Sequence, residues 1–297
     1  MNRVYWPVAL ALLVATWLGV PLGQPAAISA ATILMIGGGL PHGAYDIALL
    51  RRATTLDRSD LALAVAAYVA IVVLMALLWM VAPLPTLVLF LAVSAYHFGE
   101  DWLMLDVALL RLAAGAAVIA ASTIGHPVEV TALFVAMSDP RAAIIAQVII
   151  AAAPVALLVT AVGLVAAWRQ GSRQWAAAMT TCLALLLALP PVIGFTLFFV
   201  FLHTPRHLKQ ARMALRDMGQ ARWLATGALV SGAAILGWWA QQRLAPGQIG
   251  QPVATQAFQL LAAVALPHLL LSRWLEKRLE RAASFGPFGP NTKAVIA

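Results

Sequence analysis

Ten runs of apolar residues, most of them close to the length of a membrane crossing, dominate this chain of 297 residues. A transmembrane helix needs about 20 such residues. Of all residues, 63% are hydrophobic and 10% are charged, whereas soluble domains carry about 25% charged residues. We therefore expect an all-α, polytopic transmembrane helix bundle with about 8–10 membrane segments. The runs are 4–22, 26–50, 60–82, 84–99, 107–125, 142–168, 174–189, 191–209, 222–241 and 253–276.

These runs form one integral membrane domain over residues 1–281, without an internal repeat or a soluble domain. The runs 84–99 and 174–189 are short, so each of them either tilts across the membrane or crosses it only halfway. Residues 282–297 are predicted to be a disordered cytoplasmic tail.

The net charge of +8 would suit a nucleic-acid partner, but the basic residues gather at the ends of the apolar runs, where they mark topology. With ten segments, all but Arg141 and Arg243 of the 19 lysines and arginines fall on one side. The positive-inside tendency makes that side cytoplasmic. This predicts an integral protein of the inner (plasma) membrane, surrounded by lipid, with both termini in the cytoplasm and no nucleic-acid partner. Residues 27–29 resemble a signal-peptidase site, but the charge pattern works with 4–22 retained as a span.

Four of the six histidines occupy similar places in the even-numbered runs: His42, His97, His203 and His268. Even-numbered segments all run towards the cytoplasm in this topology. By the helical rise, each histidine lies about 20–25 Å from the outer face. We therefore expect a histidine metal site in the inner half of the membrane, with broken helices around it.

The segment 203–207 (HTPRH) contains His203 and a second histidine, His207. On a helix, residues four apart share a face and lie about 6 Å apart, a spacing that can give two imidazoles to one metal. Pro205 disfavours a straight helix, so Thr204 is either helical or the N-cap of a new helix. The alternative for His207 is a basic cluster at the membrane interface with Arg206.

Two further motifs place polar residues beside candidate ligands. Residues 37–46 (GGGLPHGAYD) weaken a helix through glycine and proline, and Asp46 could orient an imidazole from behind; the alternative is a buried His–Asp pair that only ties helices together. Residues 94–102 (SAYHFGEDW) offer His97 as a ligand. Glu100 or Asp101 could accept a hydrogen bond from a ligand histidine, or could cap a solvated helix end.

His268 follows a proline within an apolar run, and it is a ligand, a residue behind the ligands or a hydrogen-bonded core histidine. His126 falls near the opposite membrane face and is expected to be a cap or loop residue. Three or four neutral imidazoles bind iron, zinc or copper. An apolar cavity with an open metal position suits oxygen chemistry on a lipid-soluble substrate, and no catalytic residue beyond the metal centre is needed.

The chain resembles the Brp/Blh family of bacterial and archaeal β-carotene 15,15′-dioxygenases. The resemblance covers residues 39–46, His97-Phe98-Gly99, residues 203–207 and Pro267-His268, in family order and over most of the chain. It implies an integral membrane enzyme that uses Fe(2+) and O₂ to cleave β-carotene at its central double bond into two retinal molecules, which serve microbial rhodopsins. The proposed iron ligands of the family match the positions His42, His97, His203 and His207.

Around these ligands we expect Asp46, Tyr96, Glu100, Thr204 and His268. The chain departs from the family pattern in three places: Thr204 replaces a serine, Pro205 lies within the His-x-x-x-His unit, and the acids directly follow Gly99. Two alternatives remain. A membrane di-iron desaturase or hydroxylase usually carries more histidines than the six present. A metal or proton transporter using buried histidine and Asp46 would need polar residues across both halves of the membrane.

Overall fold

The computed structural model describes residues 3–54, 56–244 and 251–284, and this part of the chain consists of helices joined by short connections, without strands. The all-α prediction is therefore confirmed. The α-helices are α1 (Tyr5–Trp17), α2 (Pro25–Gly39), α3 (Asp46–Ala53), α4 (Arg58–Val81), α5 (Pro83–Gly99), α6 (Ala108–Gly125), α7 (Pro127–Met137), α8 (Ala142–Arg169), α9 (Arg173–Ala188), α10 (Pro191–Phe198), α11 (Thr204–Ala214), α12 (Gln220–Leu244) and α13 (Val253–Ser284).

Six described helices are long and apolar enough to cross a membrane, which supports the predicted membrane protein. They are Pro25–Ala53, Arg58–Val81, Ala108–Gly125, Ala142–Arg169, Gln220–Arg243 and Val253–Leu275. The runs 84–99 and 174–189, expected to be short, form α5 and α9, and both helices fall below the length of a full crossing. The sequence left residues 126–141 as a connection, whereas the structure forms α7 there. The helix α13 continues through Ser284, and the rest of the predicted tail lies outside the described residues.

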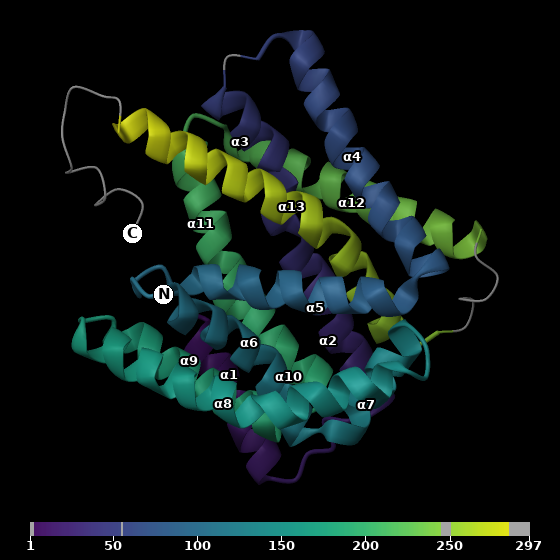
Figure 1. The fold of residues 1–297 in the computed structure, drawn as a ribbon, viewed down its shortest axis with the longest axis vertical. Helices are drawn as coiled ribbons and strands as arrows, with labels where there is room; N and C mark the ends of the chain where they lie inside the picture. The colour runs from purple at the N-terminus through teal and green to yellow at the C-terminus, as the bar shows by residue number, and fades with distance from the viewer. Residues whose placement is uncertain (1–2, 55, 245–250, 285–297) are drawn as a thin grey trace.

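The helix α13 lies at the centre of the bundle, where it contacts α2, α3, α4, α5, α7 and α12 (Figure 1). In the most apolar stretch of α13, 67% is buried inside the structure, whereas the share is 6% for α4 and 17% for α8. The last two helices therefore present most of their apolar surface to the surroundings, as lipid-facing helices do. The helix α6 packs against α5, α8 and α9 on the other side of the molecule.

Two of the histidine-bearing segments change helix type at their histidines, His42 and His203. A 3₁₀ helix, η1 (Leu40–Tyr45), separates α2 from α3, and a π-helix, η3 (Phe199–His203), joins α10 to α11. Thr204 is the first residue of α11 and does not cap it, so of the two predicted alternatives the structure has the helical one. The widened turn of η3 directly precedes Thr204 and Pro205. Gly39 is required where these segments meet, because a Cβ there would lie 2.1 Å from the Phe199 ring.

The ends of the histidine-bearing segments meet on one side of the bundle. At the end of α3, the guanidinium of Arg52 lies 2.7 Å from the carboxylate of Asp217, which follows α11. The guanidinium of Arg273 on α13 lies 3.9 Å from the carboxylate of Glu100, which directly follows α5. These pairs place the carboxyl ends of the second and eighth predicted segments together, and likewise those of the fourth and tenth.

Gly115 allows α6 to approach α5 closely, because a Cβ there would lie 1.9 Å from the carbonyl oxygen of Ala95. Gly115→Ala is expected to lower the free energy of unfolding by about 1–3 kcal/mol through overpacking, measured as a lower midpoint of thermal unfolding in detergent. Gly232→Ala on α12 is the control, since its Cβ would meet nothing within 4 Å. Equal midpoints for Gly115→Ala and the wild type would contradict the close contact.

Candidate metal centre

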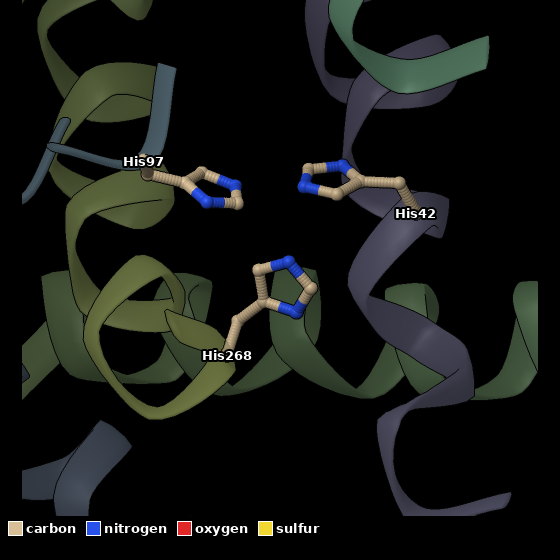
Figure 2. A group of neighbouring side chains, drawn as sticks. All are labelled: His42, His97 and His268. Atoms are coloured by element: carbon tan, nitrogen blue, oxygen red, sulfur yellow. The ribbon is translucent and has the colours of Figure 1, made fainter. Parts of the chain in front are cut away.

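Five histidine side chains from separate segments surround one buried point. His42 comes from η1, His97 from α5, His203 from η3, His207 from α11 and His268 from α13. Neighbouring ring centroids lie between 4.4 Å apart, for His203 and His207, and 6.3 Å apart, for His42 and His97. Figure 2 shows three of these rings, from His42, His97 and His268, pointing toward one another from separate helices. The structure thus brings together all four predicted ligands, and His268 with them.

The nitrogen atoms of these rings are spaced like the ligands of a metal. His42, His97 and His268 form one group whose ligand atoms all lie within 4.8 Å of one another, and His97, His203 and His207 form a second. Within the described residues, the buried Nε2 atoms of His97, His203, His207 and His268 have no hydrogen-bond partner. Buried polar atoms are nearly always satisfied, so a cluster of converging imidazole nitrogens fits a metal ion as their shared partner.

Asp46 holds the ring of His268. The Nδ1–H of His268 donates to Oδ2 of Asp46 at 2.8 Å, and the Asp46 side chain is buried. A proton on Nδ1 leaves the lone pair of Nε2 free for a metal, which is the usual role of a carboxylate behind a ligand histidine. His268 therefore has the geometry of a ligand itself, which is one of the alternatives that the sequence left open.

Asp101 holds the ring of His203 in the same way. The Nδ1–H of His203 donates to Oδ2 of Asp101 at 2.8 Å, and both side chains are fully buried. Oδ1 of Asp101 lies 3.6 Å from Nε2 of His207, and its main-chain carbonyl accepts a hydrogen bond from Arg206. From the sequence, Asp101 could either accept a hydrogen bond from a ligand histidine or lie at a solvated helix end. Its side chain is completely buried, which excludes the solvated helix end.

Two further rings, those of His97 and His42, are also fixed from behind. Nδ1–H of His97 donates to Oε2 of Glu100 at 2.7 Å, as the sequence predicted for this acid. Nδ1–H of His42 donates to the carbonyl oxygen of Gly39. Three carboxylates, from Asp46, Glu100 and Asp101, thus surround the cluster, and they can balance the charge of a divalent ion.

Tyr96 and Thr204 were also predicted to lie around the ligands, and neither side chain makes a hydrogen bond to a clustered histidine in the described residues. Tyr96 is 41% exposed, and its ring lies under the guanidinium of Arg273, so it is not part of the cluster. Adjacent residues of a helix point about 100° apart, which turns Tyr96 away when His97 points inward. Thr204 is buried directly after His203. His126 lies outside the cluster at the start of α7, near Glu129, in keeping with its predicted place in a cap or loop.

Tyr68 on α4 is a residue that the sequence analysis missed. Its hydroxyl donates to Oδ2 of Asp46 at 2.9 Å, so Asp46 is held between Tyr68 and His268. The only available signal was a tyrosine within the apolar run 60–82.

Tyr68→Phe removes only this hydroxyl, and we expect it to weaken metal binding about 3- to 10-fold, less than the 10–100-fold typical of a direct partner. Competition with a chelator measures the affinity. Tyr5→Phe is the control, because that buried hydroxyl donates to the carbonyl of Ala178, on α9. If Tyr68→Phe and Tyr5→Phe bind the metal equally well, Tyr68 does not support the cluster.

An apolar cavity of about 650 Å³ adjoins the histidines. It lies between α4, α5, α12 and α13, and His42, His97 and His268 form part of its wall. The volume is within the range of pockets that hold small organic ligands. The few polar side chains in its wall besides the histidines are Tyr68, Ser94, Ser231 and Gln241.

A comparison with protein families decides the class of the chain. The sequence model of the beta-carotene 15,15'-dioxygenase family matches residues 33–276, which include all five clustered histidines and the whole cavity wall. The chain belongs to this family. No curated protein and no solved structure matches the chain significantly.

Membership of the β-carotene 15,15′-dioxygenase family confirms the resemblance found in the sequence. The chain is an enzyme with carotenoid dioxygenase activity, as predicted. The family implies a carotenoid and O₂ as the reactants. The apolar cavity beside the histidines is chemically suited to such a substrate, since it offers a polyene an almost entirely hydrocarbon wall.

Proposed function

We propose that this enzyme cleaves β-carotene at the central 15,15′ double bond with O₂ and forms two molecules of retinal, using Fe(2+) held by the histidine cluster. The bond between the two central carbons breaks, and each carbon takes one oxygen atom from O₂. The observation that carries the proposal is the set of unpartnered imidazole nitrogens that converge beside a large apolar cavity.

The number of imidazoles favours iron over zinc. We propose His42, His97, His203 and His207 as ligands, as the sequence predicted, and add His268. Five imidazoles exceed the four ligands of a tetrahedral zinc site, and zinc has no redox chemistry. Iron accepts imidazole ligands, and the imidazoles of these five histidines would hold it beside the cavity. The bound iron would supply the activation of O₂.

The protein contributes position, charge balance and exclusion of water. Asp46, Glu100 and Asp101 hold three rings at the Nδ1 side and keep the Nε2 lone pairs free. The apolar wall of the cavity aligns the polyene along the cluster and keeps water away from the reacting carbons. No side chain needs to act as a nucleophile, and Thr204 only packs behind His203.

Product analysis with purified protein tests the proposal. Chelator-treated enzyme is given β-carotene and ¹⁸O₂ after the addition of Fe(2+), Zn²⁺ or no metal. We expect retinal only after the addition of Fe(2+), with label in the aldehyde oxygen of both fragments before exchange with water. Retinal formation that is equally fast without added iron would contradict the role of the metal.

The orientation of the protein in the membrane is part of this proposal. We propose that both termini are cytoplasmic in the inner membrane, so that the iron lies nearer the inner leaflet. Retinal then leaves into the lipid, where microbial rhodopsins take it up. The pairing of Arg52 with Asp217 and of Arg273 with Glu100 supports a common side for the ends of the histidine-bearing segments.

Reporter fusions measure this topology. Reporters fused after Gly171 and Met218 are expected to be cytoplasmic, because the basic residues gather at these connections. A reporter fused after Asp139, in the α7–α8 connection, is expected on the outer face. Opposite sides for Gly171 and Met218 would contradict the proposed topology.

A further inference from the structure

We propose that the end of the cavity remote from the histidines, formed by Phe90, Trp238 and Gln241, determines which double bond of the carotenoid is cleaved. This inference rests on the proposed function. It assigns to these side chains the role of a stop for the terminal ring of the substrate. The distance from the stop to the histidines would then set the cleavage position.

Three helices lead from the histidine cluster to this end of the cavity. On α4 the wall runs from Val65 to Leu77, and within it the path from the cluster to the remote end leads from Tyr68, which contacts Asp46, to Ala76, which contacts Gln241. The matching paths lead from His97 back to Phe90 on α5 and from His268 back to Leu260 on α13. Each path covers seven or eight residues, which is about 10–12 Å at the rise of an α-helix. The agreement of three helices indicates one elongated space with the histidines at one end.

The remote end is closed by α12. The side-chain amide of Gln241 donates to the carbonyl oxygen of Ala76 at 2.8 Å and ties α12 to α4 there. Trp238, one turn earlier, is only 7% exposed and also lines the cavity. Phe90 and Leu260 complete this end, and both are buried. A bulky ring that reached this wall could not move farther.

The side of the cavity is more open than its end. Val69 and Val73 on α4 and Leu229 on α12 line the cavity, yet they are 53%, 50% and 73% exposed. In a membrane these positions face lipid, so an apolar molecule can enter sideways between α4 and α12 and slide until its ring meets the wall.

Selection of one double bond of the polyene requires a steric stop, because the apolar wall offers few other contacts that could distinguish the double bonds. The conjugated double bonds of a polyene are chemically alike, and hydrocarbon walls carry no hydrogen bonds that could select one of them. Shape is then the remaining source of selectivity. A single methylene in an apolar pocket already changes discrimination about 10- to 200-fold, so the large indole of Trp238 can decide the position.

The experiment compares two adjacent tryptophans on α12. Trp238→Ala deepens the cavity, and we expect unequal carotenoid fragments to rise about tenfold or more relative to retinal. Trp239→Ala is the matched control, because Trp239 is 56% exposed and stacks with Arg243 outside the cavity. It should give only retinal. Fragments are identified by chromatography and mass spectrometry, and iron content is measured for each variant.

Gly237→Leu provides a second, independent test. Gly237 lines the cavity, and a Cβ there meets nothing within 4 Å, so the added side chain fills the remote end without a backbone clash. It should shorten the space and again yield unequal fragments, with unchanged iron content. If Trp238→Ala or Gly237→Leu is folded and still gives only retinal at the wild-type rate, the stop is wrong. If the wild type itself makes no retinal, the proposed function fails instead.

Discussion

His97→Ala is expected to remove the bound iron and to lower retinal formation by more than about 100-fold, beyond the loss typical of a residue behind the ligands. His97 is the residue shared by the two ligand groups, so its loss leaves neither group complete. Its ring also accounts for the hydrogen bond to Glu100. Iron per chain is measured by elemental analysis of purified protein, and retinal by chromatography.

His126→Ala is the matched control for this variant. It removes the one histidine of the chain that lies outside the cluster, so iron content and activity should remain those of the wild type. Full iron occupancy in His97→Ala would contradict the ligand assignment, and a loss of iron in His126→Ala would show that the effect is not specific to the cluster.

Asp101→Asn is expected to weaken iron binding or activity about 10- to 100-fold, the usual effect of losing a carboxylate behind a ligand histidine. The substitution keeps the shape of the side chain but removes the charge that faces His203 and lies 3.6 Å from His207. Iron affinity by chelator competition measures the loss. Asp106→Asn is the control, because that aspartate is exposed in the same connection. Equal affinities for the two variants would contradict the role of Asp101.

The helical fold could be predicted because most apolar runs are long and the breaks between them carry glycine, proline or charge. The convergence of the histidines could be predicted as well, since the even-numbered segments run in one direction and carry their histidines at similar depth. These arguments use only length, direction and the helical rise. They therefore located His42, His97 and His203 without any knowledge of which helices touch.

The residues behind the ligands were harder to predict, because their direction depends on local changes of helix type. After Gly99 the chain passes into the 3₁₀ helix η2 (Glu100–Trp102), whose tighter turn directs Asp101 into the core and keeps Glu100 beside His97. A regular helix would present these two acids differently. Tyr68 was missed because its partner Asp46 lies 22 residues away on another helix, and no periodicity within α4 reveals that contact.

X-ray absorption at the iron edge, with metal analysis of the same sample, tests the central claim most directly. We predict about one iron per chain, with a first shell dominated by imidazole nitrogen from the five clustered histidines. His203→Ala should lose iron or show fewer imidazole ligands. An iron shell made of oxygen ligands, unchanged in His203→Ala, would contradict a histidine-bound iron at the base of the cavity.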